Sequence, residues 1–297
     1  MRPELVQAAE LLQKNDPASI EQAITLLQNT VYSFSMKVCG HPEDAEDTMQ
    51  EVLYRSLGHL QKITEPKALA VWLYTVTRNR CWRMRRKSVY APAHTLSLDE
   101  LMPDERELGE LLADTAAGPE NTLLSAEQNR IVQKAIQEIP PSLRIVLVLH
   151  DMEELTTEEV AQVLDLQAGT VRVRLHRARL TLRKELSRLK AEEERRIASH
   201  GAVHNDAIAE RGRTRKPAFE CKQIFANLSE YLDGRIEPRT CDELREHIDA
   251  CPSCVVFLRD LRSAIDRCRS LQPTCDPAVL ERLRTALTRE YLRLIGI

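Results

Sequence analysis

Apolar residues recur at three- and four-residue steps through most of this chain, which is the pattern of amphipathic helices. The Val-, Ile- and Thr-rich runs typical of strands are lacking, and only nine residues are glycine. At 297 residues the chain exceeds the usual size of a single hydrophobic core. The sequence therefore predicts an all-α protein built from several small helical modules.

Two segments without helical periodicity divide the chain. Residues 91–122 are acidic and rich in Pro and Ala, and residues 191–218 are charged or small with no apolar face to bury. We interpret both as linkers. They separate three predicted modules over residues 1–90, 123–190 and 219–297.

The first module contains an acidic helix beginning at Pro42. Its apolar positions form one stripe that includes Ala45, Met49 and Val52, while acidic side chains gather on another face. That face comprises Asp44, Asp47 and Glu51. For an arbitrary protein, the ordinary interpretation of such a face is a solvated helix surface.

A basic helix follows it. No acidic residue occurs between Pro66 and Leu98, and the exposed positions of the second half are Arg78, Arg80, Arg83, Arg85, Arg86 and Lys87. A stripe of one charge sign repels itself unless an anion neutralises it, and guanidinium groups fit phosphate well. Trp82 and Tyr90 add flat faces on which an unstacked base can rest. Taken alone, this pattern fits a nucleic-acid-binding surface and an ordinary soluble surface equally well.

The second module contains a helix-turn-helix pattern. Thr156 and Glu159 form a predicted capping box, Asp165 to Gln167 make the turn, and a second helix begins near Ala168. Its buried positions are predicted to be Val171, Leu175, Ala178 and Leu182. The complementary positions are Thr170, Arg172, Arg174, His176, Arg177 and Arg179. A basic second helix after a tight turn is typical of major-groove recognition, with an ordinary helical hairpin as the alternative.

The third module holds six of the eight cysteines. No stretch is long and apolar enough for a membrane span or a signal peptide, so we expect a cytoplasmic protein with no membrane partner and reduced thiols. His247, Cys251 and Cys254 form an H-x3-C-x2-C pattern that suits tetrahedral Zn²⁺. Cys221 and Cys241 compete for the fourth ligand position.

Together, the first 190 residues resemble the extracytoplasmic-function sigma factors of the sigma-70 superfamily. The resemblance rests on HPEDAEDTMQEVLYRSL, AVWLYTVTRNRCWRMRRK and ELTTEEVAQVLDLQAGTVRVRLHRARLTLRKEL, which occur in family order and spacing. It implies that the helix-turn-helix reads the −35 element. It also implies that core RNA polymerase is contacted by Asp44, Asp47, Gln50 and Glu51, and that the −10 promoter element is contacted by Arg78, Asn79, Arg80, Arg83 and Arg86. The loop over residues 61–66 corresponds to the loop that holds a flipped base in related proteins. Asp165 stands where family members often carry Gly.

The third module resembles the zinc-binding anti-sigma domain, a type of zinc finger. That resemblance selects Cys221, with His247, Cys251 and Cys254, as the zinc ligands, and it gives Cys241 the position of an extra thiol found in redox-sensitive members. Two amphipathic helices follow the cysteine cluster. They either close a private core or dock on the sigma modules, to which a tether of about 27 residues would hold them at roughly millimolar local concentration.

The sequence thus predicts an alternative sigma factor whose fused zinc domain regulates it in cis. Two alternatives stay open: a stand-alone helix-turn-helix regulator that never joins polymerase, and a zinc domain that acts mainly as a thiol or zinc sensor or as a protein-interaction module. An enzyme is not expected, because a filled Cys3His site leaves no open coordination position and the sequence offers no pairing of a nucleophile with a base.

Overall fold

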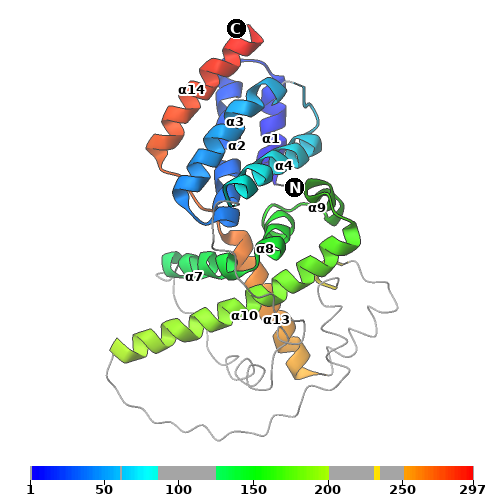
Figure 1. Cartoon of the computed structure of the whole chain (residues 1–297), viewed down its shortest axis with the longest axis vertical. Helices are drawn as coiled ribbons and strands as arrows, with labels where there is room; N and C mark the ends of the chain where they lie inside the picture. The colour runs from blue at the N-terminus through cyan, green and yellow to red at the C-terminus, as the bar shows by residue number, and fades with distance from the viewer. Residues whose placement is uncertain (1, 61, 86–124, 201–230, 235–250, 297) are drawn as a thin grey trace, which may run out of the picture. The chain divides into compact units, whose positions relative to one another are not determined.

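The computed structural model describes residues 2–60, 62–85, 125–200, 231–234 and 251–296 (Figure 1). Every regular element in these ranges is a helix, so the all-α prediction is confirmed. The described helices fall into two compact units. The first unit holds α1 (Pro3–Gln13), α2 (Pro17–Cys39), α3 (Pro42–Leu60), α4 (Pro66–Arg85), α8 (Pro141–Leu147), η3 (Val148–Met152), α9 (Thr157–Leu164) and α14 (Pro277–Ile295).

Proline begins most of the helices of the first unit, including α1 to α4. Its fixed φ suits the first helical position, where the missing N–H needs no partner. At α2 the Asp16 side chain also accepts a hydrogen bond from the Ser19 N–H at 2.9 Å. The helix ends at Gly40, whose φ of 84° is a left-handed conformation that favours glycine. These local signals set the boundaries of the bundle.

The C-terminal helix α14 packs against α2 and α3, as Figure 1 shows. Its buried stripe consists of Leu283, Leu287 and Tyr291. Gln28 on α2 donates a hydrogen bond to the Leu280 carbonyl at 3.2 Å. α14 is thus part of the core of the first unit, although about 190 residues of sequence separate it from α4.

α8 continues into the short π-helix η3, which contacts α2 and α9. The Glu153 N–H donates a hydrogen bond to the Val148 carbonyl at 2.9 Å. This bond joins residues five positions apart, one more than the hydrogen bonds of an α-helix. Glu154 then takes a φ of 58°, which is uncommon for a glutamate. The chain turns there and enters α9, which packs on α4.

The capping box predicted at the start of α9 is confirmed. Thr156 Oγ1 accepts from the Glu159 N–H at 3.2 Å, and Glu159 Oε2 accepts from the Thr156 N–H at 2.8 Å. Asp165 caps the C-terminus of α9, and its φ of 54° is the left-handed conformation in which glycine is common. α10 (Ala168–His200) begins three residues later, as predicted.

The second unit contains α7 (Ser125–Glu138), α10 from Arg172 onward, and α13 (Pro252–Ser270). Leu175, Ala178 and Leu182 are buried on α10, which confirms the predicted inward face. The module boundaries expected from the sequence stay a prediction. Among the described helices, none has the length and apolar character needed to cross a membrane.

Candidate nucleic-acid interface and metal centre

The acidic side chains of α3 line the solvent side of the helix. Asp47 and Gln50 are exposed, and Asp44 and Glu51 are partly exposed, whereas Ala45, Met49 and Val52 on the other side are buried. Tyr54 lies one turn beyond Glu51 and is 46 % exposed. Tyr54 was not among the residues predicted from the sequence, although its i+3 spacing from Glu51 places it on the same face.

Glu51 connects the acidic face of α3 to the basic face of α4. Its Oε2 lies 2.6 Å from Arg80 Nε, and its Oε1 lies 3.0 Å from Arg55 Nη2. Arg80 and Glu51 are both about one quarter exposed, whereas Arg55 is 64 % exposed. One carboxylate is therefore shared by two guanidinium groups from different helices.

On α4, Arg78 lies over the ring of Trp82, with its Cζ 4.8 Å from the ring centroid. Its Nη2 also donates to Asn79 Oδ1 at 2.7 Å. Trp82 is 40 % exposed, so part of the indole is accessible beside a guanidinium. Arg83 lies on α4, and Arg86 lies outside the described residues.

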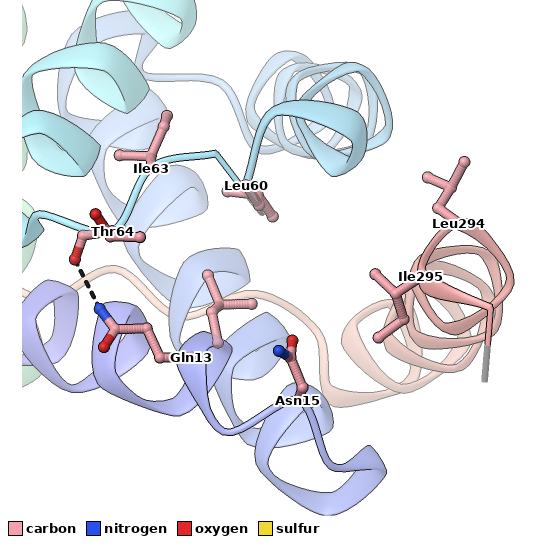
Figure 2. A pocket seen from close by; sticks show the side chains of 8 residues that line it. Gln13, Asn15, Leu60, Ile63, Thr64, Leu294 and Ile295 are labelled. Atoms are coloured by element: carbon pink, nitrogen blue, oxygen red, sulfur yellow. Dashed lines mark hydrogen bonds between the residues drawn. The ribbon is translucent and has the colours of Figure 1, made fainter.

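A cavity of about 560 Å³ lies beside the loop that joins α3 to α4 (Figure 2). Gln13 Nε2 donates to the Thr64 carbonyl at 2.7 Å and so fixes the loop to the end of α1. The last turn of α14 forms the opposite wall through Leu294 and Ile295. Residue Gln61, at the start of the predicted base-holding loop, lies outside the described residues.

The first turns of α10 present a mixed polar and apolar surface. Arg172 is exposed, and Thr170, Arg174 and Arg177 are partly exposed. Val173 is 57 % exposed between the two arginines. Val173 was not among the residues predicted from the sequence, yet it is the kind of apolar side chain that contacts a thymine methyl group in a major groove.

Two residues expected on this basic face lie deeper than predicted. His176 is largely buried, and burial, aided by the charges of Arg179 and Arg177, lowers its pKa to about 4. Arg179 is only 1 % exposed, and its Nη2 lies 2.7 Å from Asp233 Oδ1. The helical pattern put Arg179 on the exposed side because the sequence does not reveal a carboxylate 54 residues away.

Arg183 lies one turn beyond Arg179 and is also 1 % exposed. Its Cζ lies 4.7 Å from the Phe257 ring centroid, and its Nη1 lies 3.6 Å from Asp260 Oδ2. Phe257 and Asp260 belong to α13, the helix that follows the C-x2-C motif. α13 therefore packs on the basic helix through an aromatic face and a carboxylate.

Cys251 and Cys254 lie at the start of α13. The Cys254 N–H donates to the Cys251 carbonyl at 3.0 Å, so the C-x2-C segment forms the first tight turn of the helix. Cys251 is partly exposed and Cys254 is buried. A helix N-terminus stabilises thiolates, so these two residues fit a zinc-binding pair. Cys221, Cys241 and His247 lie outside the described residues.

Comparison with known proteins agrees with this arrangement. Residues 23–89 match sigma-70 region 2, residues 129–182 match sigma-70 region 4, and residues 221–254 match a zinc-finger family. The chain is similar to the ECF RNA polymerase sigma factor SigW of Bacillus subtilis (strain 168), with 27 % identity over 178 residues, which cover 59 % of this chain and 92 % of that protein.

It is also similar to the ECF RNA polymerase sigma-E factor of Escherichia coli (strain K12), with 28 % identity over 170 residues. That match covers 57 % of this chain and 87 % of the sigma-E factor, and the Salmonella typhimurium (strain LT2) sigma-E factor matches to the same extent. The chain therefore belongs to the extracytoplasmic-function (ECF) sigma factors of the sigma-70 family, as an alternative sigma factor that carries a zinc-finger domain.

Proposed function

We propose that this sigma factor binds core RNA polymerase through the acidic face of α3 and promoter DNA through α4 and α10. The polymerase-facing residues are Asp44, Asp47, Gln50 and Glu51. The −10 element would be met by Arg78, Asn79, Arg80, Arg83 and Arg86, and the −35 element by Thr170, Arg172, Arg174, His176, Arg177 and Arg179. The observation that carries the proposal is the capped helix-turn-helix whose second helix begins with one exposed and two partly exposed arginines.

The side chains of α10 suit both phosphate and base contacts with DNA. Arg172, Arg174 and Arg177 supply charge for phosphate or guanine contacts, while Thr170 lies in the first turn, where base edges are usually read. Because His176 has a pKa of about 4, it is neutral at physiological pH and would contribute hydrogen bonding rather than charge. Each well-placed base contact is typically worth about 1–3 kcal/mol of discrimination.

We further propose that the zinc domain inhibits the sigma modules in cis. Two observations support this role. Asp233 and Asp260 neutralise Arg179 and Arg183 on α10, which removes positive charge that DNA phosphates would otherwise attract. α14 covers α2 and α3, and its Leu294 and Ile295 line the cavity beside the loop that follows α3.

The proposed zinc ligands are Cys221, His247, Cys251 and Cys254. A small domain with little apolar core depends on such a site for its folding, since structural zinc is typically worth on the order of 10 kcal/mol. The role of the ion here would be structural: it would fix the start of α13 and thereby hold Phe257 and Asp260 in place.

The test is transcription from a pool of genomic DNA fragments with purified core polymerase, followed by sequencing of the transcript 5′ ends. We expect initiation at a defined set of sites by the full chain, lost in the Arg172→Ala/Arg174→Ala variant. Failure of the full chain and of a chain ending at Lys190 to select any site would contradict the proposal.

The same assay tests inhibition in cis. The Asp233→Asn/Asp260→Asn variant keeps the size of both side chains and removes both charges. We expect it to initiate more often than the unaltered chain at the same sites. Equal initiation by this variant, by the chain ending at Lys190 and by the full chain would contradict an inhibitory role.

A further inference from the structure

The cavity beside the α3–α4 loop has an apolar interior (Figure 2). Leu12 and Leu60, which line it, are almost fully buried, whereas Ile63 and Ile295 are partly exposed and Leu294 is exposed. Apolar side chains that water still reaches gain free energy when an apolar molecule covers them. The interior of this cavity therefore favours an apolar occupant.

The rim of the cavity is polar and uncharged. Gln13, Asn15 and Thr64 are its polar members, and all three are exposed. The Gln13 amide N–H already donates to the Thr64 carbonyl, whereas the Asn15 side chain offers a second amide, with both a donor and an acceptor. None of the eight described residues that line the cavity carries a charge. The rim therefore suits a neutral head group that forms hydrogen bonds.

The volume of the cavity restricts its occupant to a small molecule. About 560 Å³ falls within the range of about 300–1,000 Å³ that is common for small-molecule pockets. A single turn of a partner helix, about 10–12 Å across and 5.4 Å long, would by itself fill about 420–610 Å³. A helix from another protein is therefore too large, whereas a single hydrocarbon chain fits.

The cavity exists only while α14 is docked, because Leu294 and Ile295 form its wall from the last turn of α14. The docking of α14 on α2 and α3 buries two oxygens that have no hydrogen-bond partner among the described residues, Gln28 Oε1 and the Tyr291 hydroxyl. Buried polar groups of this kind weaken the packing around them. A molecule that fills the cavity would stabilise the docked helix, since it binds that state alone.

We propose that this cavity binds a neutral amphiphile with a hydrocarbon chain and one hydrogen-bonding head group, and that the bound molecule holds α14 on α2 and α3. The chain covers Leu60, Leu294 and Ile295, and the head group lies beside Asn15. The consequence for transcription rests on the proposed function, in which docked α14 belongs to the inhibitory domain: the amphiphile would strengthen the inhibition. The binding itself does not depend on that function.

The first test is binding of the fluorescent probe N-phenylnaphthylamine to the full chain, with decanol and decanoate as competitors. We expect decanol to displace the probe at a concentration at least about tenfold lower than decanoate at about pH 8, because the cavity offers no counter-charge to a carboxylate.

Three variants locate the site. Ile295→Trp fills the cavity and should abolish probe binding, whereas Thr285→Trp places the same side chain on the exposed side of α14 and is the matched control. Asn15→Gly removes the amide and tolerates the left-handed φ of 53°, so it should weaken decanol binding by about two- to tenfold.

The second test asks whether the bound molecule holds α14. Cys275 is buried just before α14, and mass spectrometry of its peptide follows its alkylation by iodoacetamide. Decanol at about ten times its dissociation constant should slow this alkylation by about tenfold, since reaction requires release of the helix. In Ile295→Trp, decanol should leave the alkylation rate unchanged.

Four results would overturn the proposal: equal competition by decanol and decanoate, equal probe binding by Ile295→Trp and Thr285→Trp, unchanged decanol binding by Asn15→Gly, or alkylation of Cys275 that bound decanol does not slow. Neither test involves DNA or polymerase. A chain that binds decanol as expected but selects no promoter would contradict the proposed function alone, and a chain that selects promoters but binds no amphiphile would contradict this inference alone.

Discussion

Arg80 Nε lies 2.6 Å from Glu51 Oε2, so a guanidinium proposed to meet DNA is paired with a carboxylate proposed to meet polymerase. Whatever engages one of these groups changes the environment of the other. A cation from polymerase that binds Glu51 would leave Arg80 with less neutralising charge and hence a stronger attraction for phosphate. The two proposed binding activities of region 2 would thereby be linked through one ion pair between α3 and α4.

The strength of this pair is measurable by a double-mutant cycle. We expect Glu51→Gln and Arg80→Gln to show a coupling free energy of about 0.5–1 kcal/mol in urea unfolding, since the pair is partly exposed and screened by water. Glu51→Gln with Arg55→Gln is the matched control, because the more exposed Arg55 should couple less. A larger coupling for Arg55 than for Arg80 would argue against the linkage.

The stability of α10 should depend on pH through His176. Its folded pKa of about 4 is below the ordinary value of 6.5, so the unfolded chain binds a proton at higher pH than the folded chain. The contribution of this group to the free energy of unfolding is complete above about pH 6.5 and is lost as the pH falls toward 4. The loss is about 1–2 kcal/mol at pH 5. His176→Gln should lose less stability than the unaltered chain between about pH 8 and pH 5 in urea unfolding. Parallel losses would contradict this.

Loss of the capping box at the start of α9 should destabilise the protein. Thr156→Ala removes the acceptor for the Glu159 N–H and should destabilise the chain by about 1 kcal/mol. Thr156→Ser keeps the acceptor and is the control. Thermal unfolding of the three proteins measures the difference, and equal stability of the Ala and Ser variants would show that the cap contributes little.

The docking of α14 can be followed through Cys275, which precedes it. Burial, reinforced by the charge of Glu46, raises the pKa of this thiol to about 11, so iodoacetamide should react with it slowly at about pH 8. Leu287→Ala removes a fully buried side chain and should weaken the packing by about 2–4 kcal/mol, which should speed alkylation of Cys275. Leu294→Ala, at a side chain 49 % exposed, should not.

Zinc content separates ligand cysteines from packing cysteines. We expect about one zinc per chain by elemental analysis, lost in Cys251→Ala and Cys254→Ala but retained in Cys268→Ala, whose side chain is buried farther along α13. Retention of zinc in Cys254→Ala would exclude that thiol from the proposed ligand set. Loss of zinc in Cys268→Ala as well would show that the assay reports folding of α13 rather than ligation.

Local signals in the sequence predict much of the fold. The start of α3 at Pro42, the Thr156 capping box and the turn at Asp165 follow from interactions within a few residues, and the structure has all three. The inward stripe of α10 follows likewise from helical spacing, because a helix buries the residues that recur on one side.

Contacts between distant segments cannot be predicted from such local signals. Arg179 belongs by spacing to the exposed basic side of α10, yet Asp233 pairs with it. Glu153 is, by sequence, an ordinary acid between two helices, and nothing local indicates that Lys37 and Tyr74 surround it. Pairings of this kind depend on tertiary packing, which a single sequence does not encode in any fixed spacing.

The π-helix at residues 148–152 holds one residue more than the same stretch of α-helix would, and so sets the direction of the side chains that follow it. Deletion of one residue there would restore regular α-helical spacing and rotate everything that follows by about 100°. The helix-turn-helix would keep its own cap, turn and apolar stripe, but Glu153 would face away from Lys37. A one-codon deletion would thus keep the local signals of the helix-turn-helix while removing the buried ion pair between Glu153 and Lys37 of α2.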